Sequence, residues 1–262
     1  MYESLQQMQE ICETENKAFW ELVMEEEANE KQNSHEEVFE MMRSMYRAMV
    51  QADENYEDRR SASQMTGGAG ELMAKWNRDE KTLSGPFLGQ VMERALKMAE
   101  SNACMKRIVA APTAGSCGVL PAVMITYQKL EKCPEDEIVK ALFVAAGIGQ
   151  IIASRASIAG AQGGCQAEIG SASAMTAGAL VFLRGGSLQQ IYEATALALK
   201  GLLGLVCDPV AGLVEVPCVK RNVIGAVNAV SCSDMVMAGI TSFIPVDQVI
   251  DAMDEIGRNM PC

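Results

Sequence analysis

Aromatic residues and histidine are scarce in this chain of 262 residues. Phe, Trp and Tyr make up 5% of the sequence, and His35 is the only histidine. We therefore expect a core of small and aliphatic side chains, with 18 Met as flexible filler. A structural zinc site does not fit, because the chain has neither a second histidine nor a Cys-x-x-Cys pair.

Positive charge is also in short supply. The chain has 22 Lys and Arg against 34 Asp and Glu, a formal net charge of −12. This balance argues against nucleic acid and against an anionic membrane surface as partners. Residues 1–100 hold most of the excess, with 21 acidic and 11 basic side chains, whereas 17 of the 22 Gly follow residue 100. We expect a solvated first third and a tightly turned remainder.

Long apolar runs are few. The first residues contain none, so we expect no signal peptide and a cytoplasmic protein. One uncharged stretch, 108–128, is long enough to span a bilayer. Pro112, Gly115, Gly118 and Pro121 interrupt it, and a helix exposed to lipid would tolerate them poorly. We interpret this stretch as a buried turn and expect no contact with a membrane.

Hydrophobic periodicity predicts an all-α fold of about nine helices in one domain over 1–262. Residues 1–58 would form an acidic helical arm, with one helix over 2–31 and another opened by a capping box at Ser34. Residues 59–262 would form the core, in which 213–216 is the only strand-like run of note. The glycine-rich loop 61–70 leads into a helix, and its amides could hold an anion.

Cysteine is the informative residue type. Nine cysteines in a chain of this size, with no export signal expected, do not fit a disulfide framework. Most of them, including Cys117, are interpreted as small buried hydrophobic groups. Three others lie in irregular glycine- or proline-flanked turns, where ligands and catalytic groups are usually placed: Cys165, Cys207 and Cys218.

The setting of these three thiols favours an iron–sulfur cluster, although their spacing alone is weak support. The flanking Gly and Pro would hold the backbone open so that inorganic sulfide could approach. Three thiolates on a four-iron cube leave one iron without a protein ligand. Such an iron is a Lewis acid that could bind a substrate oxygen and stabilise departing hydroxide.

Four motifs resemble those of the α chain of bacterial iron–sulfur-dependent L-serine dehydratase, an L-serine ammonia-lyase. They are SASQMTGGAG at 61–70, APTAGSCGVLPAV at 111–123, SIAGAQGGCQAEIGSASAM at 157–175 and CDPVAGLVEVPCVKRN at 207–222. The resemblance implies a [4Fe-4S] enzyme that converts L-serine to pyruvate and ammonia without pyridoxal phosphate. Its cluster ligands would be Cys165, Cys207 and Cys218, and a smaller β subunit would be its partner.

The resemblance also suggests where L-serine binds. Five residues of the first two motifs are expected to fix the substrate carboxylate: Ser61, Ser63, Thr113, Gly115 and Ser116. Arg155 and Lys106 are further candidates for that role. Cys262 is not expected to be a fourth cluster ligand, because family chains usually continue beyond the segment it resembles.

The general base stays open. Histidine is the usual base near neutral pH, but His35 lies in the acidic arm and is interpreted as a surface residue. The base could come from the β subunit, and Glu168, three residues after Cys165, is a less favoured candidate.

Three alternatives accompany this interpretation. The glycine-rich loop 61–70 could cradle the phosphate of pyridoxal phosphate, although no lysine lies in a recognisable Schiff-base setting. The chain could instead be a non-catalytic helical subunit with incidental cysteines. Within the same family, it could act on another hydroxy-acid or amino acid.

Overall fold

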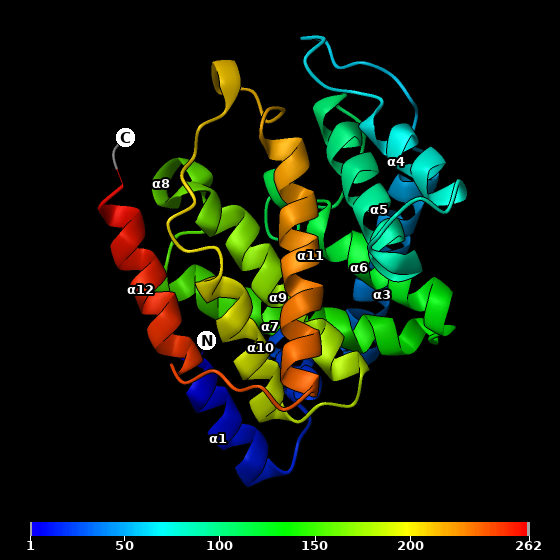
Figure 1. The fold of residues 1–262 in the computed structure, drawn as a ribbon. Helices are drawn as coiled ribbons and strands as arrows, with labels where there is room; N and C mark the ends of the chain where they lie inside the picture. Colours follow the sequence, from blue (N-terminus) through cyan, green and yellow to red (C-terminus); the bar gives the residue numbers. More distant parts are fainter. Residues whose placement is uncertain (1, 261–262) are drawn as a thin grey trace.

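The computed structural model describes residues 2–260, and all regular structure among them is helical (Figure 1). The all-α prediction is confirmed, and the run at 213–216 does not form the strand that was considered. The α-helices are α1 (Leu5–Glu15), α2 (Phe19–Lys31), α3 (His35–Glu54), α4 (Ala69–Arg78), α5 (Gly85–Ala103), α6 (Val119–Glu131), α7 (Glu135–Arg155), α8 (Gly160–Cys165), α9 (Ser171–Leu183), α10 (Leu188–Lys200), α11 (Cys218–Met237) and α12 (Val246–Arg258). Two 3-10 turns, η1 (Ala114–Ser116) and η3 (Val210–Gly212), and one π turn, η2 (Gln166–Gly170), complete the set.

The central helix is α9, which carries no charged residue and is buried from Ser171 to Val181. A helix that is apolar on all sides belongs inside a protein. Helices α6, α7, α10 and α11 pack around it (Figure 1). Small residues make this close packing possible: a Cβ added at Gly178 would lie 2.3 Å from Cδ1 of Ile148 on α7. The expectation of a core built from small side chains is met here.

Helix α7 is the one helix within residues 2–260 that is long and apolar enough to cross a membrane. Two thirds of its most apolar window, 67%, is buried inside the structure. Helices α2, α3 and α9 all pack against α7, so its apolar faces are covered by other parts of the protein.

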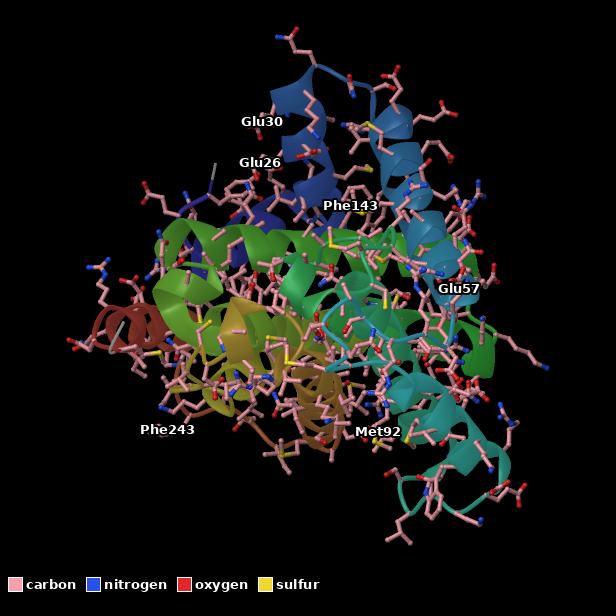
Figure 2. All side chains as sticks on the ribbon, turned by 90° about the horizontal axis from the view of Figure 1, so that it is seen from above. Glu26, Glu30, Glu57, Met92, Phe143 and Phe243 are labelled. Atoms are coloured by element: carbon pink, nitrogen blue, oxygen red, sulfur yellow. The ribbon has the colours of Figure 1, made fainter. Side chains whose placement is uncertain are left out.

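The helices of the acidic first third are solvated on one side only. Their apolar residues belong to the same hydrophobic core as α7 and α9, with Leu5 and Met8 fully buried. Figure 2 shows Phe143 of α7 between α2 and α3. The predicted single helix over 2–31 is two helices, because Asn16 adopts a left-handed conformation with φ of 51° and ends α1. The Ser34 capping box of α3 is present as predicted.

Candidate functional site

The predicted site residues lie on four irregular segments: the loop 56–68 before α4, the turn 111–118 around η1, the segment 157–170 with α8 and η2, and the loop 201–217 before α11. Figure 1 shows the loop before α4 and the loop before α11 at the same end of the molecule. Hydrogen bonds and close contacts connect the four segments, as the following paragraphs describe.

Cys165 lies where α8 turns into η2. Gly164 has a φ of 75°, which L side chains rarely adopt, and a Cβ there would lie 2.7 Å from the Leu205 carbonyl oxygen. The Gln166 amide donates to that same carbonyl at 3.0 Å. The Gly204 amide in turn donates to Oε1 of Gln166 at 2.8 Å. These contacts hold Cys165 against the segment 204–206, which leads directly to Cys207.

Arg221, one turn beyond Cys218 on α11, joins the three thiol segments. Its Nη1 donates to Sγ of Cys165 and to the Val206 carbonyl, both at 3.1 Å, and to Oδ1 of Asp208 at 2.5 Å. Sequence reasoning did not assign Arg221 a role. The sequence feature that could have indicated it is the spacing: Arg221 follows Cys218 by three positions, which places both on the same face of a helix.

The three thiols are close enough to influence one another electrostatically. Burial raises the pKa of Cys165 to about 11, Arg221 opposes that shift, and the charges of Cys218 and Cys207 add to it. Burial is also the main cause that raises the pKa of Cys218, and the nearby charge of Glu168 raises it further. Cys165 and Cys218 are buried, whereas Cys207 is exposed. The structure therefore brings the three predicted cysteines into one region, where Arg221 is the cation nearest to Cys165.

No three His, Cys, Asp or Glu side chains among residues 2–260 are placed to hold a single metal ion. A four-iron cluster is a different case, because each thiolate binds a different iron and the sulfurs stand further apart than ligands of one ion. The donors present are the buried thiols of Cys165, beside Arg221, and of Cys218, and the exposed thiol of Cys207, and this set fits a thiolate-held cluster in chemistry.

Ser61 and Ser63 are tied to the turn before Cys218. Both hydroxyls donate to Oε2 of the buried Glu215, at 2.7 Å and 2.6 Å. The Met65 amide donates to the Ser63 hydroxyl at 3.1 Å, which fixes the loop further. The sequence analysis did not identify Glu215 as a site residue. Its position inside the motif 207–222 is the only sequence feature that could have indicated a role. Both hydroxyls already have a carboxylate acceptor, so a substrate carboxylate would compete with Glu215 for them.

Gly115 and Ser116 lie in the η1 turn, Thr113 precedes it, and Asn222 of α11 anchors it. The Thr113 and Ser116 hydroxyls are 3.1 Å apart, and Ser116 is fully buried. Nδ2 of Asn222 donates to the Gly115 carbonyl at 2.8 Å and to the Cys218 carbonyl at 3.0 Å. Its Oδ1 accepts from the Gly118 amide at 2.8 Å. One buried amide side chain thus couples the serine-threonine turn to the start of the Cys218 helix.

Glu168 points towards the η1 turn. A Cβ added at Gly115 or Gly160 would lie 2.9 Å or 2.7 Å from its Oε2, so two glycines make room for this carboxylate. None of the hydrogen bonds within residues 2–260 uses the Glu168 side chain, which is half-buried. The less favoured candidate base therefore lies beside both the predicted substrate turn and Cys218.

Other predicted residues lie elsewhere. Lys106 pairs with Glu57, and Arg155 pairs with Asp251 of α12, so both already have carboxylate partners. The amides at the start of α4 do hold an anion, but it is internal: the Ala69 and Gly70 amides donate to the Glu100 carboxylate at 2.8 Å and 3.0 Å.

Two further thiols and the histidine were also considered. Cys117 is buried, as predicted, with its Sγ 3.8 Å from the Met98 carbonyl oxygen. His35 is exposed at the start of α3, as predicted for a surface residue. Cys262 lies outside the described residues.

These features define an all-helical protein whose four irregular segments bring together three thiols, an arginine, the carboxylates of Glu168, Asp208 and Glu215, and four Ser/Thr hydroxyls. The chain belongs to the serine dehydratase alpha chain family, whose model matches residues 14–262.

Relatives of the chain carry matching names. It is 42% identical to a probable L-serine dehydratase alpha chain of Bacillus subtilis, over 100% of this chain and 87% of the relative. It is 37% identical to the L-serine dehydratase alpha chain of Peptoniphilus asaccharolyticus, over 99% of this chain and 90% of the relative. It is 44% identical to L-serine dehydratase TdcG of Escherichia coli, over 63% of this chain and 37% of that longer relative.

Proposed function

We propose that this chain is the catalytic alpha chain of an L-serine dehydratase, a lyase that deaminates L-serine to pyruvate and ammonia. Family membership and the names of the relatives support the reaction. The observation that carries the proposal is the convergence of Cys165, Cys207 and Cys218 beside the Thr113–Ser116 turn and the Glu168 carboxylate. In keeping with the term alpha chain, the partner is a smaller β subunit. The enzyme is assigned to the cytoplasm, with neither nucleic acid nor a membrane as a partner.

The proposed cofactor is a [4Fe-4S] cluster held by Cys165, Cys207 and Cys218. When bound, it supplies a Lewis-acidic iron without a protein ligand, which makes hydroxide a better leaving group. The position of Arg221 supports this ligand set, because a guanidinium that donates to the Cys165 sulfur stabilises the thiolate form over the thiol.

The remaining groups bind substrate and move a proton. In the proposal, the Thr113 and Ser116 hydroxyls and the turn at Gly115 receive the substrate carboxylate, together with Ser61 and Ser63 once these release Glu215. Glu168, or a base from the β subunit, takes the Cα proton as the β-hydroxyl leaves. The resulting aminoacrylate tautomerises to an imine, and water hydrolyses the imine to pyruvate and ammonium.

The pyridoxal-phosphate alternative loses its main support in the structure. Its phosphate was to bind the glycine-rich loop, but Glu100 accepts from two amides at the start of α4. A phosphate there would face a buried carboxylate, which like-charge repulsion disfavours.

The decisive experiment compares two triple variants, each co-expressed with a β subunit and purified without oxygen. In the first, the three site cysteines are changed (Cys165→Ala, Cys207→Ala, Cys218→Ala). In the matched control, three other cysteines are changed (Cys12→Ala, Cys133→Ala, Cys232→Ala). Iron, acid-labile sulfide and pyruvate formation from L-serine are measured for both.

We expect the site variant to lose iron, sulfide and pyruvate formation together, while the control keeps about four irons per chain. Air should inactivate the wild type and the control, and iron with reductant should restore them. Serine turnover by the site variant would refute the cluster. A comparison of L-serine, L-threonine and D-serine tests the substrate, and a preference for either of the latter two would refute L-serine.

Glu168→Gln tests the base. If Glu168 removes the Cα proton, kcat should fall by about 100-fold or more, because general bases contribute factors of that size. A smaller loss with unchanged iron content would assign the base to the β subunit.

A further inference from the structure

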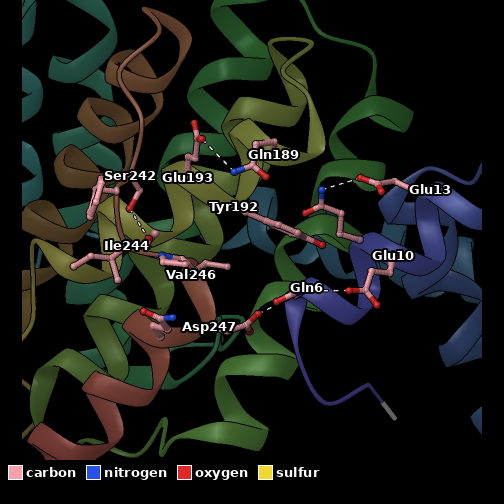
Figure 3. Close-up of a pocket in the computed structure, with 15 residues that line it drawn as sticks. Gln6, Glu10, Glu13, Gln189, Tyr192, Glu193, Ser242, Ile244, Val246 and Asp247 are labelled. Atoms are coloured by element: carbon pink, nitrogen blue, oxygen red, sulfur yellow. Dashed lines mark hydrogen bonds between the residues drawn. The ribbon is translucent and has the colours of Figure 1, made fainter.

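A cavity of about 480 Å³ lies away from the four loops, between α1, α10 and the segment that leads into α12 (Figure 3). No residue of the proposed catalytic site lines it. It is open to solvent on the side of α1, where Glu10 and Glu13 are exposed. The function proposed above makes no use of this cavity.

The lining of the cavity is strongly acidic. It has four carboxylates and, among the described residues, no Lys, Arg or His. Three of the carboxylates accept only from a glutamine side chain one helical turn away, in the pairs Gln6–Glu10, Gln9–Glu13 and Gln189–Glu193. The fourth, Asp247, accepts from the Leu5 and Gln6 amides at the start of α1, both at 3.0 Å. None of the four forms a salt bridge with residues 2–260, so their charge is not neutralised there.

An unpartnered hydroxyl lies at the floor of the same cavity. Tyr192 is 4% exposed, and its Oη is buried without any hydrogen-bond partner. Figure 3 shows the Tyr192 side chain reaching from α10 towards α1. A buried phenol without a partner costs free energy unless a ligand supplies one. Tyr192 therefore points to a ligand that approaches from the cavity.

The opposite wall is apolar and exposed. Phe243 is fully exposed at 101%, Ile244 is 36% exposed and Pro245 is exposed, and the buried Val246 follows them. Figure 2 shows Phe243 at the edge of the molecule. An aromatic ring at the mouth of an acidic cavity suits a cation that also has a hydrocarbon body.

We propose that this cavity binds an organic monocation, an alkylammonium or alkylguanidinium group on a short hydrocarbon chain. The ammonium would donate to the Tyr192 hydroxyl and to the Glu13 carboxylate, the other carboxylates of the lining, Glu193 among them, would add negative potential, and the hydrocarbon would extend towards Ile244 and Phe243. Because no residue of the catalytic site is involved, the proposal stands or falls independently of the dehydratase activity.

The test titrates the full chain with n-butylammonium chloride by isothermal titration calorimetry, with 1-butanol and sodium butyrate as neutral and anionic analogues. Two further probes, 1-butylguanidinium and Nα-acetyl-lysine methylamide, define the source of the cation. We expect butylammonium to bind with a dissociation constant of about 1 mM, and neither the alcohol nor the carboxylate to bind measurably. Stronger binding of the lysine amide would assign the site to a side chain of a partner polypeptide. Weaker binding of the lysine amide would assign the site to a free amine.

Three variants locate the site. Tyr192→Phe removes only the unpartnered hydroxyl, so the fold should keep its stability while affinity falls about ten-fold. Glu13→Gln and Glu193→Gln should each lower the affinity two- to five-fold, as expected for carboxylates open to solvent.

Glu255→Gln is the matched control, because it removes one exposed acidic charge from α12 outside the cavity and should leave binding unchanged. Equal binding of butanol, or unchanged affinity in Tyr192→Phe and Glu193→Gln, would overturn the proposal. A loss in Glu255→Gln as large as in Glu193→Gln would also overturn it, since only general attraction by the acidic chain would then remain.

Discussion

At the scale of single residues, the eight cysteines within residues 2–260 differ sharply in their surroundings. Burial raises the pKa of Cys12 and Cys232 to about 11 and that of Cys117 to about 12. Only the thiolate reacts with alkylating agents, and at about pH 8 these groups are thiolate in about one molecule in a thousand or fewer. Cys207 is exposed. The same chain therefore contains buried thiols with low reactivity and at least one accessible thiol.

We predict that iodoacetamide modifies Cys207 first in the metal-free chain at about pH 8, and leaves Cys12, Cys117 and Cys232 unmodified. The thiolate fraction of the buried groups should rise about ten-fold for each pH unit up to their raised pKa values, so their labelling should still be increasing at about pH 10. Peptide mapping by mass spectrometry gives the order. Unfolding in guanidinium chloride is the control, because all nine thiols should then react. Early labelling of Cys117 would contradict the buried assignment.

Asn222 is the residue on which two segments of the site depend most directly. We predict that Asn222→Ala lowers the free energy of unfolding by about 2–4 kcal/mol, because it removes three hydrogen bonds and leaves buried groups of Gly115 and Gly118 unpaired. Chemical denaturation measures the change. Asn259→Ala is the matched control, since Asn259 is exposed and its loss should cost less than about 0.5 kcal/mol. Equal effects of the two substitutions would show that the anchor is not structural.

The residues that sequence reasoning found and those it missed differ in kind. Cysteines and hydroxyl-bearing turns stand out because their chemistry is unusual for a loop. Arg221, Glu215 and Asn222 were missed because they act through partners distant in sequence, such as Asn222 with Gly115, 107 positions away. A single sequence does not show such a pairing, and only folding brings the two residues together.

At the scale of the elements, the turn from α8 to η2 depends on Gly164. We predict that Gly164→Ala destabilises the chain by more than Gly212→Ala, because both glycines have a positive φ but only Gly164 has neighbours in the way. Left-handed backbone costs a non-glycine residue about 1–2 kcal/mol, and this part is common to both variants. The difference comes from the Leu205 carbonyl oxygen, 2.7 Å from the added Cβ, and from the Met260 sulfur at 2.6 Å. Thermal unfolding of the two variants measures it, and equal melting temperatures would contradict the steric argument.

The elements also show how far periodicity carries a prediction. The all-α class and the capping box at Ser34 follow from local sequence and are confirmed. The stretch 108–128, predicted as a buried turn, is buried from Gly115 to Thr126, but from Val119 on it forms α6. The break at Asn16 is not signalled by glycine or proline, and the amphipathic pattern continues across it. The loop 61–70 was considered able to hold an anion through its glycine amides, and the Ala69 and Gly70 amides do bind one, but it is the internal Glu100 carboxylate of α5, which no local pattern indicates.

At the scale of the whole molecule, charge composition proved a poor guide to burial. The first 58 residues are acidic, yet α2 and α3 pack on α7, and α1 packs on α2 and α12, because acidic side chains occupy the other faces of these helices. The amphipathic helix pattern, rather than the net charge, determines which side of such a segment is buried.

Deletion of residues 2–58 tests this conclusion directly. Nine large apolar or aromatic side chains of this segment are buried: Leu5, Met8, Phe19, Leu22, Val23, Met24, Val38, Tyr46 and Met49. Their burial is worth about 10 kcal/mol or more, as large as the net stability of a typical domain. We therefore predict that the shortened chain is insoluble or unfolded, as measured by circular dichroism and size-exclusion chromatography. The matched control keeps the segment and removes three exposed charges (Glu30→Gln, Glu36→Gln, Glu54→Gln), and it should fold with a nearly unchanged melting temperature. A soluble shortened chain that unfolds cooperatively near the wild-type temperature would show instead that residues 1–58 are a separate arm.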